Sequence, residues 1–427
     1  MSLTAHLNQK LANLLPKGAP FAIAFSGGGD STALVHSLKD HPQATHVFII
    51  DHNLRSDSAK EAQAALSFAR KCGYDAKVII WSHDSPTTGV QEKARQGRYK
   101  IMAHLCIEAG VEYLLTAHNQ DDQAETVMMR MDRQTDWRGA AGMAEMTYGA
   151  IWPAMARLTL VRPLLDFSRQ DLRDYNRKHN LSWAEDPSNQ NLDYTRIRAR
   201  AFLGRNPDIR ADMLATSREM RGFLEVEKAM LREQFALIGE MHKHGYITLT
   251  DYPLPELLRH CLRCVGGQGG PIAASKVKYL LHRMRTKPFF KSATLHGAMV
   301  AKYKNGFVIC RDLVAVKGRQ DRAKDTNDYF KRLTFRLSDT PRVWDGRFLV
   351  TGPKTRSYMG SVYLNSENLT EEQSRILKSI AAPARPTLPV SKKENSIRIL
   401  GAGDHGYRAT KSLVKTRLEA ALGGKIA

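Results

Sequence analysis

The chain has 427 residues, of which 64 are Lys or Arg and 43 are Asp or Glu, so its formal net charge is +21. This length predicts two or three domains that can each bury a core. We expect a soluble, cytoplasmic protein with no membrane association, because no apolar run reaches about 18 residues and the first residues lack a signal-peptide pattern. The five cysteines are too few and too scattered for a disulfide framework.

The positive charge is concentrated in the C-terminal part of the chain. Residues 1–250 hold 31 Lys and Arg against 29 Asp and Glu, whereas residues 251–427 hold 33 against 14. We therefore predict a nearly neutral catalytic part joined to a basic part that binds a polyanion, with RNA as the leading candidate. A basic surface that serves only solubility or nonspecific adhesion is the alternative.

Apolar runs and helical periodicities alternate in the first part of the chain. Strands are expected at residues 20–25, 45–51, 75–81, 111–118 and 160–165, and helices at residues 1–17, 30–38, 58–71, 90–109, 120–130 and 169–179. This alternation is typical of βαβ units. It predicts an α/β fold with a doubly wound parallel sheet, Rossmann-like, whose ligands lie beyond the carboxyl ends of the strands.

The later part of the chain predicts other elements. A mobile glycine-containing loop is expected at residues 137–147, and a long helix from about residue 208 to 242 provides a linker. A mainly helical domain that ends in a hairpin should follow, and then a small α+β domain. The predicted domain boundaries are 1–215, 216–245 for the linker, 246–320 and 334–427. Cys261 and Cys264 have metal-ligand spacing, but they lie on an expected helix without a second pair, so two buried helix residues are the simpler interpretation.

The most informative stretch follows the first strand and reads Ser26-Gly27-Gly28-Gly29-Asp30-Ser31. Three adjacent glycines let backbone N–H groups approach a ligand that a Cβ would exclude, and the helix N-terminus that follows favours a phosphate. The hydroxyls of Ser26 and Ser31 can donate to phosphate oxygens, and Asp30 is suited to orienting the loop or holding Mg²⁺. Neither the Walker A pattern nor the dinucleotide-binding glycine pattern is present.

Charged residues follow the later strands. Asp121 and Glu125 share one helix face at i, i+4, which is unfavourable for two like charges unless a cation, either Mg²⁺ or an amine substrate, lies beside them. An acidic first turn that only complements the helix dipole is the alternative. Arg55, Arg95 and Arg98 either clamp phosphate or RNA, or are ordinary solvated side chains.

Taken together, these segments resemble the tRNA(Ile)-lysidine synthetases, a branch of the N-type ATP pyrophosphatases, or PP-loop family. The matching segments, in order, are Ser26 to Ser31, Asp51-His52-x-Leu54-Arg55, Glu92-x-x-Arg95-x-x-Arg98-Tyr99, Ala117-His118-x-x-Asp121-Asp122-Gln123-x-Glu125-Thr126, Arg162-Pro163-Leu164 and Asp186-Pro187-Ser188-Asn189. The chain departs from the family at Asn119, where a second histidine is usual, and at Ile197, where an asparagine is usual. Beyond these segments only Thr294-Leu295-His296-Gly297 and the layout of two further domains match.

The resemblance implies a ligase that uses ATP and Mg²⁺. Enzymes of this family adenylate C2 of the wobble cytidine in the CAU-anticodon isoleucine tRNA and release pyrophosphate, and free L-lysine then displaces AMP to form lysidine. Residues 1–215 are then the catalytic domain, and residues 246–320 and 334–427 bind tRNA. The oligomeric state, a homodimer included, stays open.

The resemblance also implies roles for particular residues. ATP is expected to bind Ser26, Gly27, Gly28, Gly29, Asp30 and Ser31, with Asp30 placing Mg²⁺. The expected catalytic residues are Asp30, Asp121, Asp122 and Glu125, and the residues expected to bind tRNA or substrate are His52, Arg55, Arg95, Arg98 and Arg196.

Three other functions compete with this one. A tRNA thiolase with the same ATP loop would need redox cysteines beside the site, and Cys72 and Cys106 do not form a C-x-x-C pair. An amidating synthetase would not explain the basic C-terminal part. A nucleotide-regulated RNA-binding protein without catalysis would release no pyrophosphate in the presence of RNA.

Overall fold

The computed structural model describes residues 2–51, 58–81, 90–133, 136–185, 195–314, 333–338, 340–352, 357–362, 369–393, 396–401 and 411–426. The chain forms two compact units, Met1–Glu225 and Val226–Ala427, and the boundary lies within one long helix, α9 (Pro207–Ile238). Within the described ranges, no helix combines the length and the apolarity needed to cross a bilayer. The four-part division predicted from the sequence stays a prediction.

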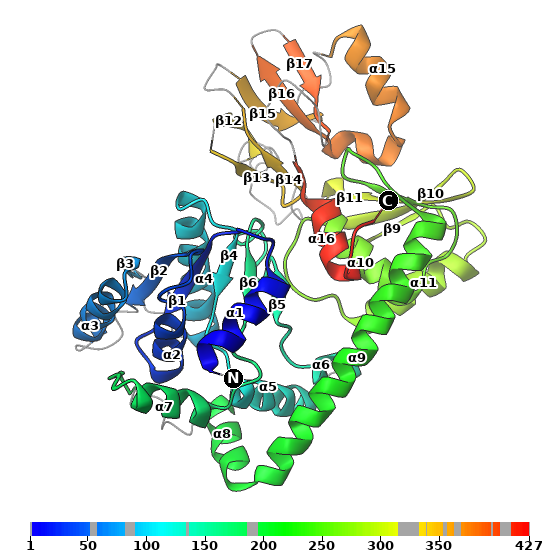
Figure 1. The fold of residues 1–427 in the computed structure, drawn as a ribbon. Coiled ribbons are helices and arrows are strands. Elements are labelled where there is room, and N and C mark those ends of the chain that lie inside the picture. Colours follow the sequence, from blue (N-terminus) through cyan, green and yellow to red (C-terminus); the bar gives the residue numbers. More distant parts are fainter. Residues whose placement is uncertain are drawn as a thin grey trace. The chain divides into compact units, whose positions relative to one another are not determined.

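A six-stranded sheet forms the centre of the first unit (Figure 1). Its order is β3 (Asp75–Ile80), β2 (Ala44–Asp51), β1 (Phe21–Phe25), β4 (Tyr113–Leu115), β6 (Thr159–Val161) and β5 (Met146–Tyr148). Five strands are parallel, and the edge strand β5 is antiparallel to β6. The predicted doubly wound parallel sheet is therefore confirmed, with an antiparallel edge added.

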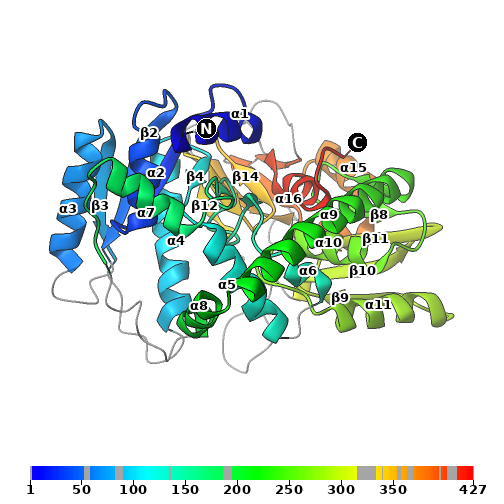
Figure 2. The same ribbon diagram turned by 60° about the horizontal axis from the view of Figure 1, so that its bottom comes forward.

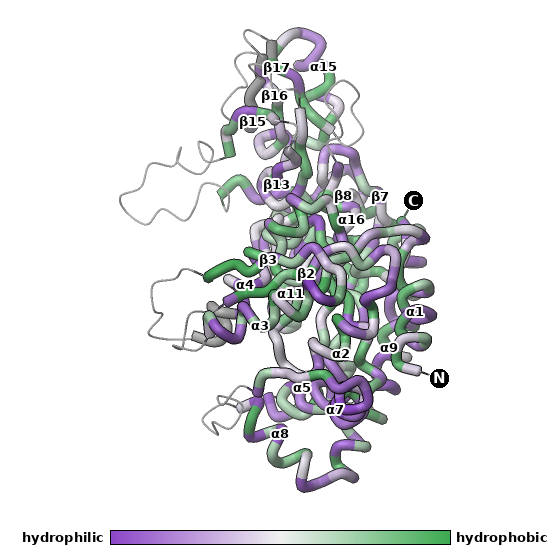
Figure 3. Tube along the Cα trace, turned by 60° about the vertical axis from the view of Figure 1, so that its left-hand side comes forward, coloured by the Kyte–Doolittle hydropathy of each residue, from purple (hydrophilic) through white to green (hydrophobic). Residues whose placement is uncertain are grey.

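Alternation of side chains along the strands places a core on each face of this sheet. On β1, Phe21, Ile23 and Phe25 belong to one buried cluster, and Ala22 belongs to the other. Helices cover both faces (Figures 1 and 2). The cluster that contains Phe21 includes residues of α1 (Leu3–Leu14), α2 (Gly29–Ser37), α3 (Ser58–Lys71) and α7 (Arg169–Lys178), and the cluster that contains Ala22 includes residues of α4 (Val90–Glu108). The unit also contains α5 (Gln120–Asp132), α6 (Trp137–Ala140) and α8 (Thr195–Arg205). The largely hydrophobic strands β2 and β3 contrast with the largely hydrophilic helix α7 (Figure 3).

The strand order reverses beside β1, which is the feature that positions the site. The chain runs from β1 outward to β2 and β3, and then returns to place β4 on the other side of β1. In open α/β sheets the loops that leave the strands at such a reversal diverge and leave room for a ligand. Here these are the loops after β1 and β4.

The second unit contains a five-stranded antiparallel sheet and two smaller ones. The larger sheet runs β7 (Gly239–Met241), β8 (Ile247–Leu249), β11 (Gly306–Arg311), β10 (Ala298–Tyr303) and β9 (Ser292–Leu295), and it packs with α10 (Pro255–Val265), α11 (Ala274–Thr286) and α16 (Leu413–Leu422). One of the smaller sheets contains β12 (Phe335–Arg336), β15 (Ser357–Ser361), β16 (Pro389–Lys393) and β17 (Ser396–Ile399). The other contains β13 (Arg342–Trp344), β14 (Phe348–Val350) and β18 (Lys411–Ser412). Helix α15 (Glu371–Ser379) and a 3-10 segment, Ala382–Thr387, complete the unit.

Several local predictions meet the structure here. The expected hairpin near residues 301–312 is confirmed as β10 and β11, and Cys261 and Cys264 are buried in α10. The domain that we expected to be mainly helical also contains a sheet. The sequence indicated only the hairpin of this sheet. The prediction of a loop at residues 137–147 was wrong in part, because this segment begins with the short helix α6 and leads into β5. The predicted boundary at residues 316–333 lies largely outside the described residues.

Candidate active site

The loop after β1 is folded around its two serine hydroxyls. The Ser26 and Ser31 hydroxyl oxygens lie 3.0 Å apart, and the Ser31 hydroxyl donates to the Gly28 carbonyl oxygen at 2.9 Å. Gly27 has a φ of +79°, a conformation that side chains other than glycine rarely adopt. The N-cap of α2 is Gly28, which has no side chain to bond the first N–H groups of the helix. The loop and the positive end of the helix dipole therefore suit a phosphate.

Residues of α7 and of the segment after it brace this loop from outside. The Asn176 side-chain amide donates to the Gly29 carbonyl oxygen at 2.8 Å, and the Ala184 N–H donates to the Gly27 carbonyl oxygen at 3.0 Å. A Cβ added to Gly29 would lie 3.3 Å from the Trp183 ring. The glycines thus allow close packing as well as the turn.

The acidic residues after β4 lie on the first turns of α5. This helix begins with a capping box, in which the Asn119 side chain accepts from the Asp122 N–H and the Asp122 carboxylate accepts from the Asn119 N–H. Such reciprocal bonds satisfy N–H groups that the helix leaves unpaired. Asp121, Asp122 and Glu125 are therefore presented by a firmly capped helix, and the Glu125 side chain is 1% exposed.

Four arginines of the chain surround these carboxylates. Arg169 lies 3.3 Å from Asp122 and 3.5 Å from Glu125. Other pairs are Arg196 to Glu125 at 2.9 Å, Arg200 to Glu125 at 2.7 Å and Arg210 to Asp121 at 2.9 Å. We expected a bound cation beside Asp121 and Glu125. The chain itself supplies the positive charge, so these like charges do not by themselves require Mg²⁺ or an amine.

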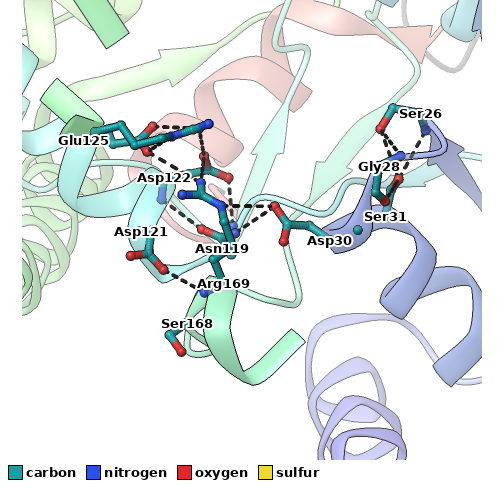
Figure 4. Close-up of polar contacts among 12 residues, drawn as sticks. Ser26, Gly28, Asp30, Ser31, Asn119, Asp121, Asp122, Glu125, Ser168 and Arg169 are labelled. Atoms are coloured by element: carbon teal, nitrogen blue, oxygen red, sulfur yellow. Dashed lines mark hydrogen bonds and ion pairs between the residues drawn. The ribbon is translucent and has the colours of Figure 1, made fainter. Parts of the chain in front are cut away.

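Asp30 connects the glycine loop with this cluster (Figure 4). Its carboxylate accepts from the Asn119 side-chain amide at 3.0 Å and lies 3.7 Å from the Arg169 guanidinium. The Arg169 backbone N–H donates to Asp121 at 2.7 Å. Asn119 and Arg169 therefore bring the carboxyl groups of two separate motifs into one site.

The carboxyl groups differ in how well their charge is compensated. Burial raises the pKa of Asp30 to about 6; Arg169 opposes this rise only in part, and the neighbouring Asp122 charge adds to it. For Asp121, burial also acts to raise the pKa, but the bonds from Arg169 and Arg210 leave it below its usual value. Of Asp30 and Asp121, Asp30 is therefore the one whose negative charge a further cation would stabilise more.

A basic region adjoins the cluster at His118. The pKa of this imidazole is well below its usual value because the ring is buried, and because Arg162, Arg196, Arg98 and Arg95 repel a positive charge there. The His118 ring nitrogen Nδ1 lies 2.8 Å from the Thr116 hydroxyl. A neutral imidazole among arginines fits a site that accepts an anion.

The predicted site residues are brought together to different degrees. Asp30, Asp121, Asp122, Glu125 and Arg196 form one cluster, and Arg95 and Arg98 lie close enough to His118 to affect its pKa. His52 and Arg55 lie outside the described residues. Within the described ranges, no group of three or more His, Cys, Asp and Glu side chains is gathered as a metal centre.

The sequence predicted no role for several residues of the cluster, which are Arg169, Arg200, Arg210 and Asn119, the last noted only as a departure from the family. Arg169 stands directly after Ser168, which caps α7, so its sequence context indicated only a helix start. Arg200 stands two positions after Arg198 in a basic helix, where solvated arginines are ordinary. Their proximity to the carboxylates arises from packing between helices distant in sequence.

The chain is similar to known proteins along most of its length. Residues 3–206 match the model of the PP-loop domain family, so the first unit is a PP-loop ATP-binding domain. A protein of Anaplasma marginale described as tRNA(Ile)-lysidine synthase is 32% identical over 325 residues, which cover 72% of this chain and 68% of that protein. The protein of the same description from Ruegeria pomeroyi is 30% identical, and the match covers 82% of this chain and 80% of that protein. The protein of this description from Caulobacter vibrioides is 29% identical, and the match covers 95% of this chain and 93% of that protein.

This chain belongs to the tRNA(Ile)-lysidine synthase family. The family resemblance predicted from the motifs is thereby confirmed, and so is the prediction that the protein is an enzyme of this family.

Proposed function

We propose that this protein joins lysine to C2 of the wobble cytidine of the CAU-anticodon tRNA(Ile) through an adenylated tRNA intermediate, with release of pyrophosphate and AMP. The observation that carries the proposal is the link from Asp30 through Asn119 and Arg169 to the carboxylates of α5. It joins a phosphate-binding loop to a cluster of opposite charges. Two successive reactions at one carbon need such a shared site.

The loop after β1 is assigned to ATP in this proposal. Ser26 to Ser31 and the N-terminus of α2 would hold the phosphates, because their N–H groups and hydroxyls suit an anion. Mg²⁺ would supply charge neutralisation on the departing pyrophosphate. Asp30 fits a ligand of this ion, because Mg²⁺ commonly takes one or two carboxylates together with substrate phosphates, and because its raised pKa marks a charge with incomplete compensation.

The cluster on α5 is assigned to lysine. Free lysine carries two ammonium groups and a carboxylate, and the cluster offers both acidic and basic partners to such a molecule. Asp121, Asp122 and Glu125 would hold the ammonium groups and accept the proton that the attacking amine must lose. Arg169, Arg200 and Arg210 would hold the lysine carboxylate, for which their fork geometry is suited.

The basic region around His118 is assigned to the anticodon. Arg95, Arg98 and Arg196 would contact RNA phosphates close to the reacting base, and His52 and Arg55 are further candidates from the sequence. A base in an anticodon loop can be unstacked and held in a site, as sequence-specific RNA recognition requires. The wobble cytidine held on this side of the site would then face the ATP that adenylates it.

The experiment that tests the proposal measures incorporation of radiolabelled lysine into a transcript of the CAU-anticodon tRNA(Ile). ATP and Mg²⁺ are present, and the control transcript has uridine in place of the wobble cytidine. We expect label only with cytidine at that position, only from lysine among the amino acids, and in step with AMP formation. Product from a sulfur donor or ammonia, without label from lysine, would exclude this substrate and favour a competing PP-loop reaction.

A further inference from the structure

One part of the second unit lacks acidic residues entirely. Residues 257–311 contain 11 Lys or Arg and no Asp or Glu. This span includes most of α10, and all of α11 and the strands β9 to β11. Arg259 and Arg311 pair with Glu256 and Asp345, which lie just outside this span. The excess of exposed positive charge that the other residues provide attracts polyanions over distances of about 10 Å at moderate salt.

Helix α11 packs on the core with one side and exposes an aromatic ring on the other. Its buried residues Val277, Leu280, Leu281 and Met284 pack into the core of the unit with α10 and the large sheet. On the opposite side, Tyr279, His282 and Thr286 follow one another at i, i+3 and i+7, and all are exposed. The side chain of Tyr279 is 64% exposed. The helix thus carries an exposed aromatic ring on a surface rich in cations.

The turn after α11 holds a second exposed ring. Pro288 disfavours helical backbone at Lys287, and the helix ends before it. The next two aromatic residues then take opposite sides. Phe290 packs on the core, with its ring centroid 6.3 Å from that of Phe307, whereas Phe289 is 90% exposed.

This turn is held in place by backbone hydrogen bonds. The Phe290 N–H donates to the Lys287 carbonyl oxygen at 3.1 Å, and the Lys302 N–H of β10 donates to the Lys291 carbonyl oxygen at 2.9 Å. Phe289 is therefore presented on an anchored segment, with exposed Lys287 and Lys291 on either side. A ring on an anchored backbone loses less conformational entropy when it binds a partner than a ring on a mobile loop does.

Arginines lie over the neighbouring rings. The Arg283 guanidinium carbon is 6.0 Å from the Tyr279 ring centroid, and that of Arg285 is 5.6 Å from the Tyr252 ring centroid. Rings and guanidinium groups both stack on nucleobases. Lys276, Lys278, Lys287 and Lys291 are exposed around them and can contact phosphates.

We propose that α11 and the turn after it form an RNA-stacking surface, on which Tyr279 and Phe289 stack on unpaired bases of the tRNA while the surrounding lysines hold its backbone. This assignment rests on the proposed function, which makes a tRNA the substrate. Unpaired bases are the favoured target because a double helix covers the base faces that an exposed ring would contact. An acidic protein would match the charge as well, so the tRNA substrate of the proposed function is what makes unpaired bases the favoured occupant.

The test measures the affinity of the full-length protein for the tRNA at several salt concentrations. The Tyr279→Ala and Phe289→Ala variants should each bind at least about fivefold more weakly, as removal of a stacked base predicts. Their slope of log K against log salt should equal that of the wild type, because both variants keep all the lysines that face phosphates. A Lys287→Ala, Lys291→Ala double variant should instead lower this slope by about 0.7 for each phosphate that it no longer neutralises.

The chain offers matched controls. Leu237 on α9 is 82% exposed and lies outside this surface, so Leu237→Ala should leave tRNA affinity at the wild-type value. Tyr279→Phe and Phe289→Trp keep a ring and should retain most of the affinity. Equal melting temperatures of variant and wild-type protein establish that a weaker affinity does not come from unfolding.

The possible results test the stacking surface and the proposed lysine-joining reaction independently of each other. The proposal is overturned if the two alanine variants bind tRNA as Leu237→Ala does, or if duplex RNA competes for the rings as well as a single strand of equal length. If the wild type incorporates no lysine and yet the aromatic variants lose RNA affinity, the proposed function fails and the stacking surface stands. If lysine is incorporated and the variants bind normally, the surface alone fails.

Discussion

Asp30 lies where burial opposes its negative charge. Its pKa is about 6 in the folded protein, against an ordinary value of 3.8. The folded protein therefore keeps a proton between these two pH values that the unfolded chain has already released. Stability falls as the pH rises through this window, and the decrease is complete above it.

Asp30→Asn should therefore stabilise the protein at pH 7. The upper limit is about 3 kcal/mol, which corresponds to the full pKa shift, and structural relaxation will reduce it. The gain should shrink toward zero as the pH is lowered to about 4. Urea unfolding at the two pH values, followed by tryptophan fluorescence, measures this difference.

Asp122→Asn provides the opposite expectation in the same experiment. Asp122 lies 3.3 Å from Arg169 and 3.6 Å from Arg200, so its charge is compensated by close partners. Its removal should destabilise the protein at pH 7, because the arginines then lack a neighbouring carboxylate. An Asp30→Asn variant that is also less stable at pH 7 would contradict our account of the Asp30 environment.

At the scale of elements, helix α5 is joined to the turn after α6 through one glutamine. The Gln123 amide donates to the Met143 carbonyl oxygen at 3.1 Å and to the Ser217 hydroxyl at 2.9 Å, and it accepts from the Met143 N–H at 2.8 Å. These bonds hold the turn and α9 against the helix that carries the acidic cluster. Their geometry depends on Gly142.

Gly142→Ala should weaken this connection. Gly142 has a φ of +70°, and a Cβ there would lie 2.6 Å from the Gln123 amide nitrogen. Backbone strain and displacement of Gln123 together should destabilise the first unit by about 1 to 3 kcal/mol, and lysine incorporation should fall because α5 carries the cluster. Urea unfolding and the incorporation assay measure the two effects.

Gly222→Ala is the matched control for this change. It lies in α9, and a Cβ there meets no atom within 4 Å. Alanine is the better helix former, so this variant should gain up to about 1 kcal/mol of stability. A Gly142→Ala variant as stable as Gly222→Ala would mean that the turn accommodates the new methyl group without moving Gln123.

At the scale of the whole molecule, charge and chemistry are assigned to different parts of the chain. The ATP loop lies in the nearly neutral part, whereas residues 251–427 carry 33 Lys and Arg against 14 Asp and Glu. Asp30→Ala should therefore abolish pyrophosphate release and leave the salt-sensitive binding of tRNA largely intact. Filter binding over a range of salt concentrations, beside a pyrophosphate assay, compares the two activities, and an equal decrease of both would contradict this division.

Much of the first unit was predictable because its elements carry strong local patterns. The strand β1 is a continuous apolar run and β2 contains one at residues 47–50, and both were predicted within one residue of their observed bounds. The helix α6 has only four residues and β7 and β8 have three each, which is too short for any periodicity to appear. Of the larger sheet in the second unit, only the hairpin of β10 and β11 was therefore visible in the sequence.

The amino-acid sequence by itself determined the class of fold, the glycine-rich loop after β1 and the acidic residues of α5, because each depends on residues close together in the chain. Only the tertiary structure decided how the acids are compensated. Arg169 is 47 residues from Asp122, and Arg210 is 89 residues from Asp121. The link between Asn119 and Asp30 likewise joins the ends of two strands that only the sheet order brings together. Coulomb and hydrogen-bond energies depend on distance in space, which local sequence patterns do not contain.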